Sequence, residues 1–228
     1  MRRLTTLLFL AGLVFLLVVL ADSLPFGDPP MRVGTAIQQG AASEVGAANF
    51  VTAVVLGYRG LDTLGELSIL FAAATAGGLV LGTAHGGARR RPGGFILRTG
   101  SDLLFPLLLV VGLYVVVHGH LTPGGGFQGG VVLAAAFFLP MLARPHETLN
   151  HTWLSLVEGL AGTAFIAIGL LALFHDHTFL APLFHKGVFG ELVSSGSLPL
   201  LYLAVGLKVG SELASLLSRL ASEDGTAP

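Results

Sequence analysis

The sequence predicts an all-α membrane protein, a polytopic bundle of about six transmembrane helices with one short interfacial helix. Of its 228 residues, 53% are hydrophobic and only 11% are charged, and the mean hydropathy is +0.81. Soluble domains carry roughly 25% charged residues, so this chain has too few to cover a water-exposed surface. Its 32 glycines suit the close helix contacts that small residues allow in lipid.

Six apolar segments are long enough to span a bilayer, which needs about 17 residues or more in a helix. They cover residues 4–21, 62–82, 101–119, 127–143, 153–174 and 190–217. A secretory signal is the alternative for the first, because Ala21-Asp22-Ser23 loosely resembles a cleavage site. We interpret it as a span. Residues 22–48 are too polar for the hydrocarbon core, and the apolar residues 47–57, about half the spanning length, predict the interfacial or re-entrant helix.

An arginine-rich loop over residues 83–100 predicts the domain organisation. It separates a two-span module (residues 1–88) from a four-span domain (95–220), and residues 221–228 form a polar tail that we expect to be disordered. If the N-terminus is inside, one side of the membrane collects Arg2, Arg3, Arg89, Arg90, Arg91, Arg98, Arg144 and Arg219. The other side collects Arg32, Arg59 and Lys186. The positive-inside rule therefore predicts that both termini are cytoplasmic.

Composition also excludes several classes of function. A net charge of −1 with only 12 basic residues argues against a nucleic-acid partner. The absence of cysteine excludes disulfides, thiol catalysis and cysteine-ligated zinc or iron–sulfur centres in this chain. No nucleophile–base pair or cofactor fingerprint is evident in the sequence, so we expect neither an enzyme nor a cofactor.

Lys208 and Glu212 are ionisable residues inside the last predicted span. Lipid makes such groups costly, and they are retained mostly for function or for pairing. Their spacing of four places both side chains on one face of a helix, where they can pair. One interpretation is a proton or cation relay within the bundle. The alternatives are a self-neutralised pair or a lysine bound to a carboxylate of a neighbouring helix.

Glu66 is a second ion-path candidate, together with Arg59 and Asp62. It is predicted to lie one turn into the second span, near a membrane face. The segment Thr63-Leu64-Gly65-Glu66 has the spacing of a capping box, in which Glu66 would satisfy backbone N–H groups at the helix start. Alternatively, the carboxylate could bind Na⁺ or a proton at a gate.

The segment 119–130 is the most distinctive local feature of the sequence. Its core consists of Pro123, Gly124, Gly125, Gly126, Phe127, Gln128, Gly129 and Gly130. Three successive glycines permit φ > 0 and a tight reversal between two spans, while Gly129 and Gly130 give the next helix a bare face for close packing. Irregular backbone at membrane depth borders protein or water. The turn is therefore a simple hairpin, or one whose carbonyls border an aqueous ion path.

Histidines 118, 120, 175, 177 and 185 raise the question of a metal site. Residues two positions apart on a helix do not face one another, and no carboxylate-rich motif accompanies these histidines. We therefore expect ordinary hydrogen-bonded histidines rather than metal ligands, and His120 remains a candidate for the ion path.

The segment Asp102–Ala143 resembles the B subunit of the Mrp-type multisubunit Na⁺/H⁺ antiporter. The resemblance is carried by Gly119-His120 and Pro123-Gly124-Gly125-Gly126-Phe127-Gln128-Gly129-Gly130, and Gly206-Leu207-Lys208-Val209-Gly210 also fits that family. It extends over residues 95 to 220.

Residues 45–82 resemble a different protein, the extreme C-terminal part of the antiporter's large A subunit. The residues that carry this are Asn49-Phe50-Val51-Thr52 and Arg59-Gly60-Leu61-Asp62-Thr63-Leu64-Gly65-Glu66. In membrane-bound hydrogenase relatives, that part is a separate small protein. The chain therefore looks like a fusion of that small module with the B subunit.

The resemblance implies an accessory, non-catalytic subunit of a monovalent cation (Na⁺)/proton antiporter. Its partners would be other membrane subunits, including large ones related to those of respiratory complex I, which carry the proton channel. This chain would contribute packing and part of the Na⁺ route, through Glu66 or around Phe127. Two alternatives are the same module in a redox-driven complex such as a membrane-bound hydrogenase, and a stand-alone channel. The stand-alone channel or transporter is disfavoured because the sequence shows no paired inverted repeats with broken helices.

Overall fold

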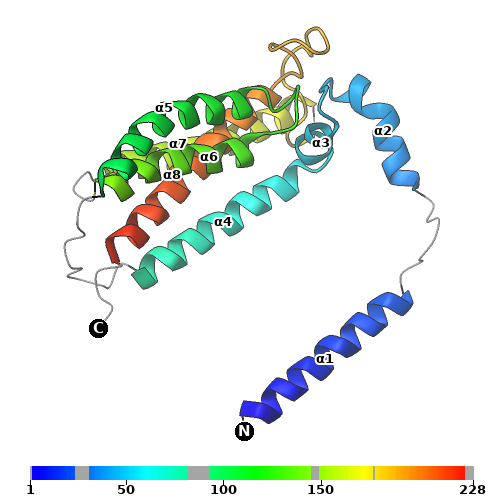
Figure 1. Cartoon of the computed structure of the whole chain (residues 1–228). Helices are drawn as coiled ribbons and strands as arrows, with labels where there is room; N and C mark the ends of the chain where they lie inside the picture. The colour runs from blue at the N-terminus through cyan, green and yellow to red at the C-terminus, as the bar shows by residue number, and fades with distance from the viewer. Residues whose placement is uncertain (1, 24–30, 82–92, 145–148, 177, 224–228) are drawn as a thin grey trace. The chain divides into compact units, whose positions relative to one another are not determined.

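The computed structural model describes residues 2–23, 31–81, 93–144, 149–176 and 178–223, and every regular element among them is a helix (Figure 1). The helices are α1 (Arg2–Ser23), α2 (Arg32–Glu44), α3 (Phe50–Thr52), the π-helix η1 (Ala53–Tyr58), α4 (Gly60–Leu81), α5 (Phe95–Val117), α6 (Gly126–Ala143), α7 (His151–Asp176) and α8 (Leu198–Glu223). Six of them, α1 and α4 to α8, are long and apolar enough to cross a membrane. The predicted all-α fold is confirmed.

Several predicted boundaries differ from those observed. Residues 190–197 were assigned to the last span, but they form a loop in which Gly190, Ser195 and Gly196 have positive φ values, so α8 begins only at Leu198. The predicted loop 83–100 ends earlier than expected, because α5 begins at Phe95 and includes Arg98. The arginines at positions 89–91 and the predicted boundary near residue 88 lie outside the described residues.

Other elements extend or complete the predicted ones. The predicted short interfacial helix is present as α3 and η1, whereas α2, within the polar stretch 22–48, was not predicted. α8 continues to Glu223, into the predicted tail, and residues 224–228 are outside the described part of the chain.

Internal contacts divide the chain into two units, residues 1–38 and 39–228. The first contains α1, none of whose apolar span from Leu4 to Ser23 is buried. A helix that is hydrophobic on all sides needs lipid or protein around it. α1 therefore has the surface of a membrane helix.

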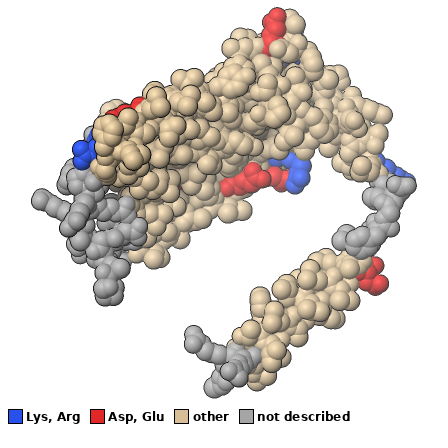
Figure 2. Space-filling model, viewed as in Figure 1, with Lys and Arg blue, Asp and Glu red and all other residues tan. Residues whose placement is uncertain are grey.

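In the second unit, α8 is the central helix. It packs against α4, α5, α6 and α7, and 61% of its apolar window is buried, compared with 11% for α4. Side chains without charge cover most of the visible surface of the bundle (Figure 2). The outer helices therefore present apolar faces to the membrane, and Lys208, Ser211 and Glu212 of α8 lie inside.

Bare glycine faces bring α5, α6 and α8 together, as the sequence predicted. A Cβ atom on Gly129 would lie 2.8 Å from the carbonyl oxygen of Gly112 in α5, and one on Gly130 would lie 2.9 Å from that of Gly206 in α8. Real Cβ atoms essentially never approach so closely. The two glycines thus set the distance between α6 and its two neighbours.

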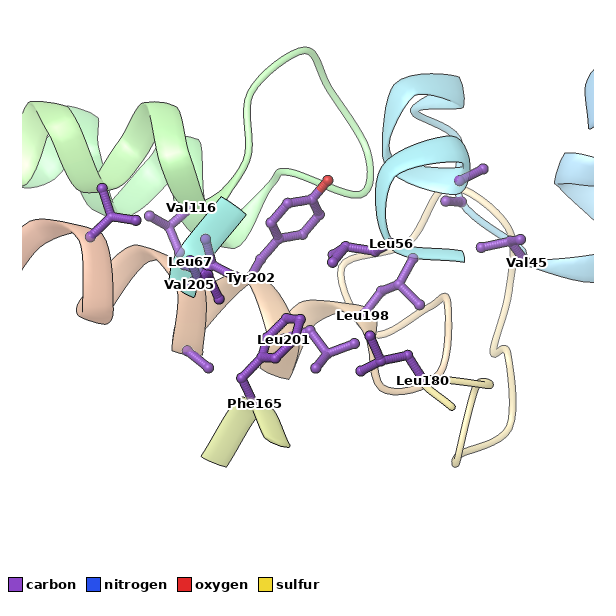
Figure 3. Packing of buried hydrophobic residues seen from close by; sticks show 14 of the residues in the cluster. Val45, Leu56, Leu67, Val116, Phe165, Leu180, Leu198, Leu201, Tyr202 and Val205 are labelled. Carbon is purple, nitrogen blue, oxygen red and sulfur yellow. The ribbon is translucent and has the colours of Figure 1, made fainter. Parts of the chain in front are cut away.

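An apolar cluster closes one end of the bundle (Figure 3). Leu198 and Leu201 at the start of α8 are fully buried, as are Leu56 of η1 and Leu180 of the loop that precedes α8. Figure 3 shows these side chains turned toward one another with Phe165 of α7 beneath them. The short helices and the loop 178–197 are therefore packed onto the ends of the spans.

The glycine-rich turn needs positive φ at two of its three successive glycines. Gly124 and Gly125 have φ values of 153° and 136°, whereas Gly126 is already the first residue of α6. The N–H of Gly125 donates to the carbonyl of Val115, 3.2 Å away, and so ties the turn back to α5. The predicted tight reversal is confirmed.

We predict that Gly125→Val destabilises the protein by at least about 1–3 kcal/mol, since a β-branched residue is strained at this φ. In addition, its Cβ would lie 2.7 Å from Cε1 of Tyr202. Gly100→Val in α5 is the matched control, because a Cβ there meets nothing within 4 Å. Thermal unfolding in detergent measures the difference, and equal stability of the two variants would contradict this explanation of the turn.

Candidate ion-path site

Asn49 and Thr52 hold the glycine-rich turn in place. The Nδ2 of Asn49 donates to the carbonyl oxygens of Gly119 and Thr122, both at 2.8 Å, and Oγ1 of Thr52 donates to the same Gly119 oxygen at 2.5 Å. The Oδ1 of Asn49 also accepts from the N–H of Val51, which caps α3. Buried carbonyls must find such donors. The short helices, which precede the turn by some 70 residues, therefore complete it.

Tyr202 joins α8 to the same network. Its hydroxyl donates to Oγ1 of Thr52 at 2.6 Å, and Figure 3 shows it reaching from α8 toward the turn and the short helices. Both side chains are buried. The turn, the short helices and α8 thus share one buried chain of hydrogen bonds, whose members strengthen one another in a low-dielectric interior.

His120 lies in the turn and is completely buried. Its Nε2 is 3.1 Å from the carbonyl oxygen of Leu192, to which it donates, whereas Nδ1 has no hydrogen-bond partner within the described structure. Burial lowers the pKa of His120, and His118 acts in the same direction, against hydrogen bonds at the backbone of Glu191 and Leu192. His120 is therefore a neutral imidazole that fastens the loop before α8.

Lys208 and Glu212 form the ion pair that their spacing predicted. The Nζ of Lys208 is 2.9 Å from Oε2 of Glu212 and 3.3 Å from Oε1 of Glu158, in α7. It also lies 4.9 Å from the centre of the Phe71 ring of α4. The lysine and Glu212 are buried, and the side chain of Glu158 is 18% exposed. One ammonium group therefore binds two carboxylates and connects three helices.

The predicted capping box at Glu66 is wrong. α4 begins at Gly60, so Thr63 lies within its first turn, and its Oγ1 donates to the carbonyl oxygen of Val55 at 2.8 Å. This hydrogen bond satisfies a carbonyl of η1, where the i→i+5 bonds of a π-helix replace the usual i→i+4 bonds of an α-helix. Glu66 thus has no capping role.

Glu66, Asp62 and Arg59 are all exposed near the beginning of α4, where charged side chains gather on the surface (Figure 2). Arg59 pairs with Asp62 at 2.5 Å, and Glu66 has no ion pair within the described residues. The structure does not bring this group into contact with Lys208 or His120. An exposed carboxylate on a spanning helix needs water or another polypeptide beside it.

His118 and His185 make ordinary contacts with neighbouring residues. His118 stacks on Tyr114 with 4.1 Å between the ring centres, and Nδ1 of exposed His185 accepts from the N–H of Gly187. His177 is outside the described residues. Within the described part of the chain, no three histidine, aspartate or glutamate side chains gather as metal ligands would.

Glu158, Asn49 and Thr52 were missed as site residues. Glu158 is a carboxylate inside the predicted span 153–174, so the reasoning that singled out Lys208 would have found it. Asn49 and Thr52 gave no such signal, because an amide and a hydroxyl in a short apolar segment have many uses. Only the fold brings them to the turn.

We predict that acid destabilises the protein partly through His120. Because its pKa is lowered by folding, the unfolded chain binds the proton first as the pH falls below about 6.5, and the stability present above that pH is then lost. His120→Gln, which can still donate to Leu192, should flatten this loss in thermal unfolding at a series of pH values. The exposed His185→Gln should retain the wild-type slope; equal slopes for both variants would exclude His120 as the cause.

Comparison with known proteins identifies the second unit. Residues 96–215 match the family model described as "Domain related to MnhB subunit of Na+/H+ antiporter". The uncharacterized protein MJ1307 of Methanocaldococcus jannaschii is 29% identical over 206 residues, 77% of this chain and 78% of that protein. The putative antiporter subunit mnhB2 of Staphylococcus haemolyticus is 45% identical over 56 residues, which cover 24% of this chain and 40% of that protein.

Two solved structures are similar over nearly the whole chain. A chain of the membrane-bound sulfane sulfur reductase, an archaeal respiratory membrane complex, is 36% identical, with a TM-score of 0.81, and the match covers 97% of this chain and 99% of that one. A chain of the Mrp complex from Dietzia sp. DQ12-45-1b is 25% identical, with a TM-score of 0.76, and the match covers 100% of this chain but 27% of that one. This six-span protein therefore belongs to the family of membrane proteins related to the MnhB subunit of Na⁺/H⁺ antiporters.

Proposed function

We propose that this chain is an accessory, non-catalytic membrane subunit of a multisubunit monovalent cation (Na⁺)/proton antiporter, in which it helps to form or support the cation path. The observation that carries this proposal is the buried cluster of Lys208, Glu158 and Glu212 in a chain of the MnhB-related family. Ionisable groups inside a membrane bundle are costly, and they commonly mark ion pathways. The main partners are the other membrane subunits of such a complex.

The described side chains support a structural and electrostatic role for this subunit. Its buried polar groups are joined in ion pairs and in hydrogen bonds that hold the turn, rather than in a nucleophile–base arrangement. Exposed Glu66 lies on a spanning helix at the surface of this chain. Its place suits a cation path shared with a neighbouring subunit.

We place both termini in the cytoplasm of a prokaryotic cell. Six spans return the chain to the side on which it starts. Arg98, Arg144 and Arg219 lie toward the ends of α5, α6 and α8 that share one face of the bundle, while Arg59 and Lys186 lie toward the opposite face. This distribution agrees with the positive-inside rule.

We further propose that the two predicted modules, residues 1–88 and 95–220, originate in the fusion of two subunits. The match to a much longer chain of the Mrp complex is consistent with a relation to a large antiporter subunit. In this chain, Asn49 and Thr52 of the first module bind the glycine-rich turn of the second. A fusion would keep that pair of surfaces together.

A second candidate is the same role in a redox-driven complex. The observation that favours it is the match to a chain of the sulfane sulfur reductase. That match covers nearly all of both chains, at 36% identity. The chemistry would then lie in other chains, and this subunit would serve the ion-translocating part. Genes for iron–sulfur or hydrogenase-like proteins beside the gene for this chain would favour this setting.

We predict that Glu66→Gln lowers Na⁺/proton exchange in everted vesicles by about tenfold, which is about 1.4 kcal/mol of barrier, while the complex still assembles. The reason is that the exposed carboxylate is not needed for the fold of this chain. Glu191→Gln, in the loop before α8, is the control and should exchange normally. Parallel loss of exchange and assembly in Glu66→Gln would assign Glu66 a structural role instead.

A further inference from the structure

A groove with two cavities runs along α8 between α4 and α7. Both flanking helices pack on α8, without extensive packing against each other. One cavity, of about 290 Å³, is bordered by Thr75, Ser155, Ser215 and Arg219. The other, of about 270 Å³, is bordered by Leu64, Ser68 and Thr163. Each has room for several water molecules. Three hydroxyl groups line the first cavity, whereas the second is mainly apolar and has the hydroxyl groups of Ser68 and Thr163.

The charged cluster and Phe71 lie where the two cavities meet. Phe71 and Glu158 line both cavities, Glu212 lines the first, and Lys208 lines the second. The first cavity extends from there toward the end of α8, where Arg219 lies, and the second toward the beginning of α4. The cluster and the aromatic ring therefore lie between a first cavity rich in hydroxyl groups and a second, mainly apolar one.

The charges of the cluster do not balance. With both carboxyl groups ionised, Lys208, Glu158 and Glu212 carry a net charge of −1. Oε1 of Glu212 is buried and has no hydrogen-bond partner within the described structure. An unbalanced charge and an unpartnered carboxylate oxygen are both costly in a membrane interior. One additional proton would remove the net charge.

The other ionisable groups described around the cavities do not neutralise the net negative charge of the cluster. Arg219 is exposed and donates to the carbonyl oxygen of Gly78, with no ion pair to either carboxylate in the described structure. The imidazole of His151, at the start of α7, lies against the hydroxyl groups of Ser215 and Ser218. The residues of α4 that line the cavities are uncharged.

We propose that the cluster of Lys208, Glu158 and Glu212 is a proton-binding site between two water-filled cavities, and that protons reach it through the groove between α4 and α7. The proton resides on the carboxyl pair and leaves as hydronium into either cavity. A metal cation is a poorer occupant, because the ammonium group already lies between the carboxylates and repels a second positive charge. The claim that the bound proton takes part in transport rests on the proposed function.

The bound proton is tested by infrared spectroscopy of the full chain in lipid vesicles. We expect the C=O stretch of a protonated carboxyl group at neutral pH. It should be lost in Lys208→Met/Glu158→Gln/Glu212→Gln, a variant that leaves no unpaired charge to prevent folding, and retained in Glu191→Gln. Lys208→Met alone should enlarge the band, since two carboxyl groups then need protons. A band unchanged in the triple variant, or one that appears only when Na⁺ is withdrawn, would overturn the proposal.

The water in the cavities is tested by cysteine labelling, for which a chain without cysteine is well suited. In the assembled complex in membrane vesicles, Ser215→Cys and Thr163→Cys should react with a membrane-impermeant thiol reagent from opposite sides. Val110→Cys is the control, because it is 67% exposed on α5 and lines neither of the two cavities. If all three were equally unreactive, the cavities would be dry and the proposal would fail. Neither measurement depends on ion exchange, so loss of exchange in Glu66→Gln is a separate result.

Discussion

The interaction on which the bundle most depends is the contact of one ammonium group with two carboxylates in a hydrocarbon environment. Lys208 lies on the most buried of the spanning helices, where its charge is removed from bulk water. Glu212 on the same helix forms an ion pair with Lys208, and the ion pair with Glu158 connects α8 to α7. Since apolar side chains gain little by leaving lipid for one another, polar contacts and close packing decide which faces of the helices meet. The cluster therefore orients α7 on α8, while the glycines of α6 orient the opposite side.

A second set of polar contacts connects the short helices before α4 to the MnhB-related part of the chain. Asn49 and Thr52 provide the donors that the carbonyl of Gly119 needs, and Tyr202 of α8 bonds to Thr52 in turn. The glycine-rich turn can abandon regular structure near the membrane because these side chains satisfy its backbone. The turn, which lies in the MnhB-related part, is thus completed by side chains of the short helices that precede that part.

The sequence predicts the spans well and the site only in part, for a physical reason. Spans follow from the length and polarity of a segment, as for α4 and α6, which were placed almost to the residue. The pair Lys208–Glu212 follows from helical periodicity. Glu158 could have been identified as a buried carboxylate, but its partner could not, because pairing between helices depends on how they pack. The capping box was misassigned because Thr63 bonds to Val55 in the preceding π-helix, a geometry that no local pattern indicates.

The most direct test of the role of Lys208 is a double-mutant cycle measured by unfolding of the full chain in detergent. Lys208→Met should cost about 3–5 kcal/mol when both carboxylates are present, since it leaves them without a countercharge. The same change should cost less, by at least about 1 kcal/mol, when Glu158 and Glu212 are already glutamine, because contacting groups are coupled. An equal cost in the two backgrounds would show that the ion pairs do not hold α7 to α8, and would contradict the central place of Lys208 in the bundle.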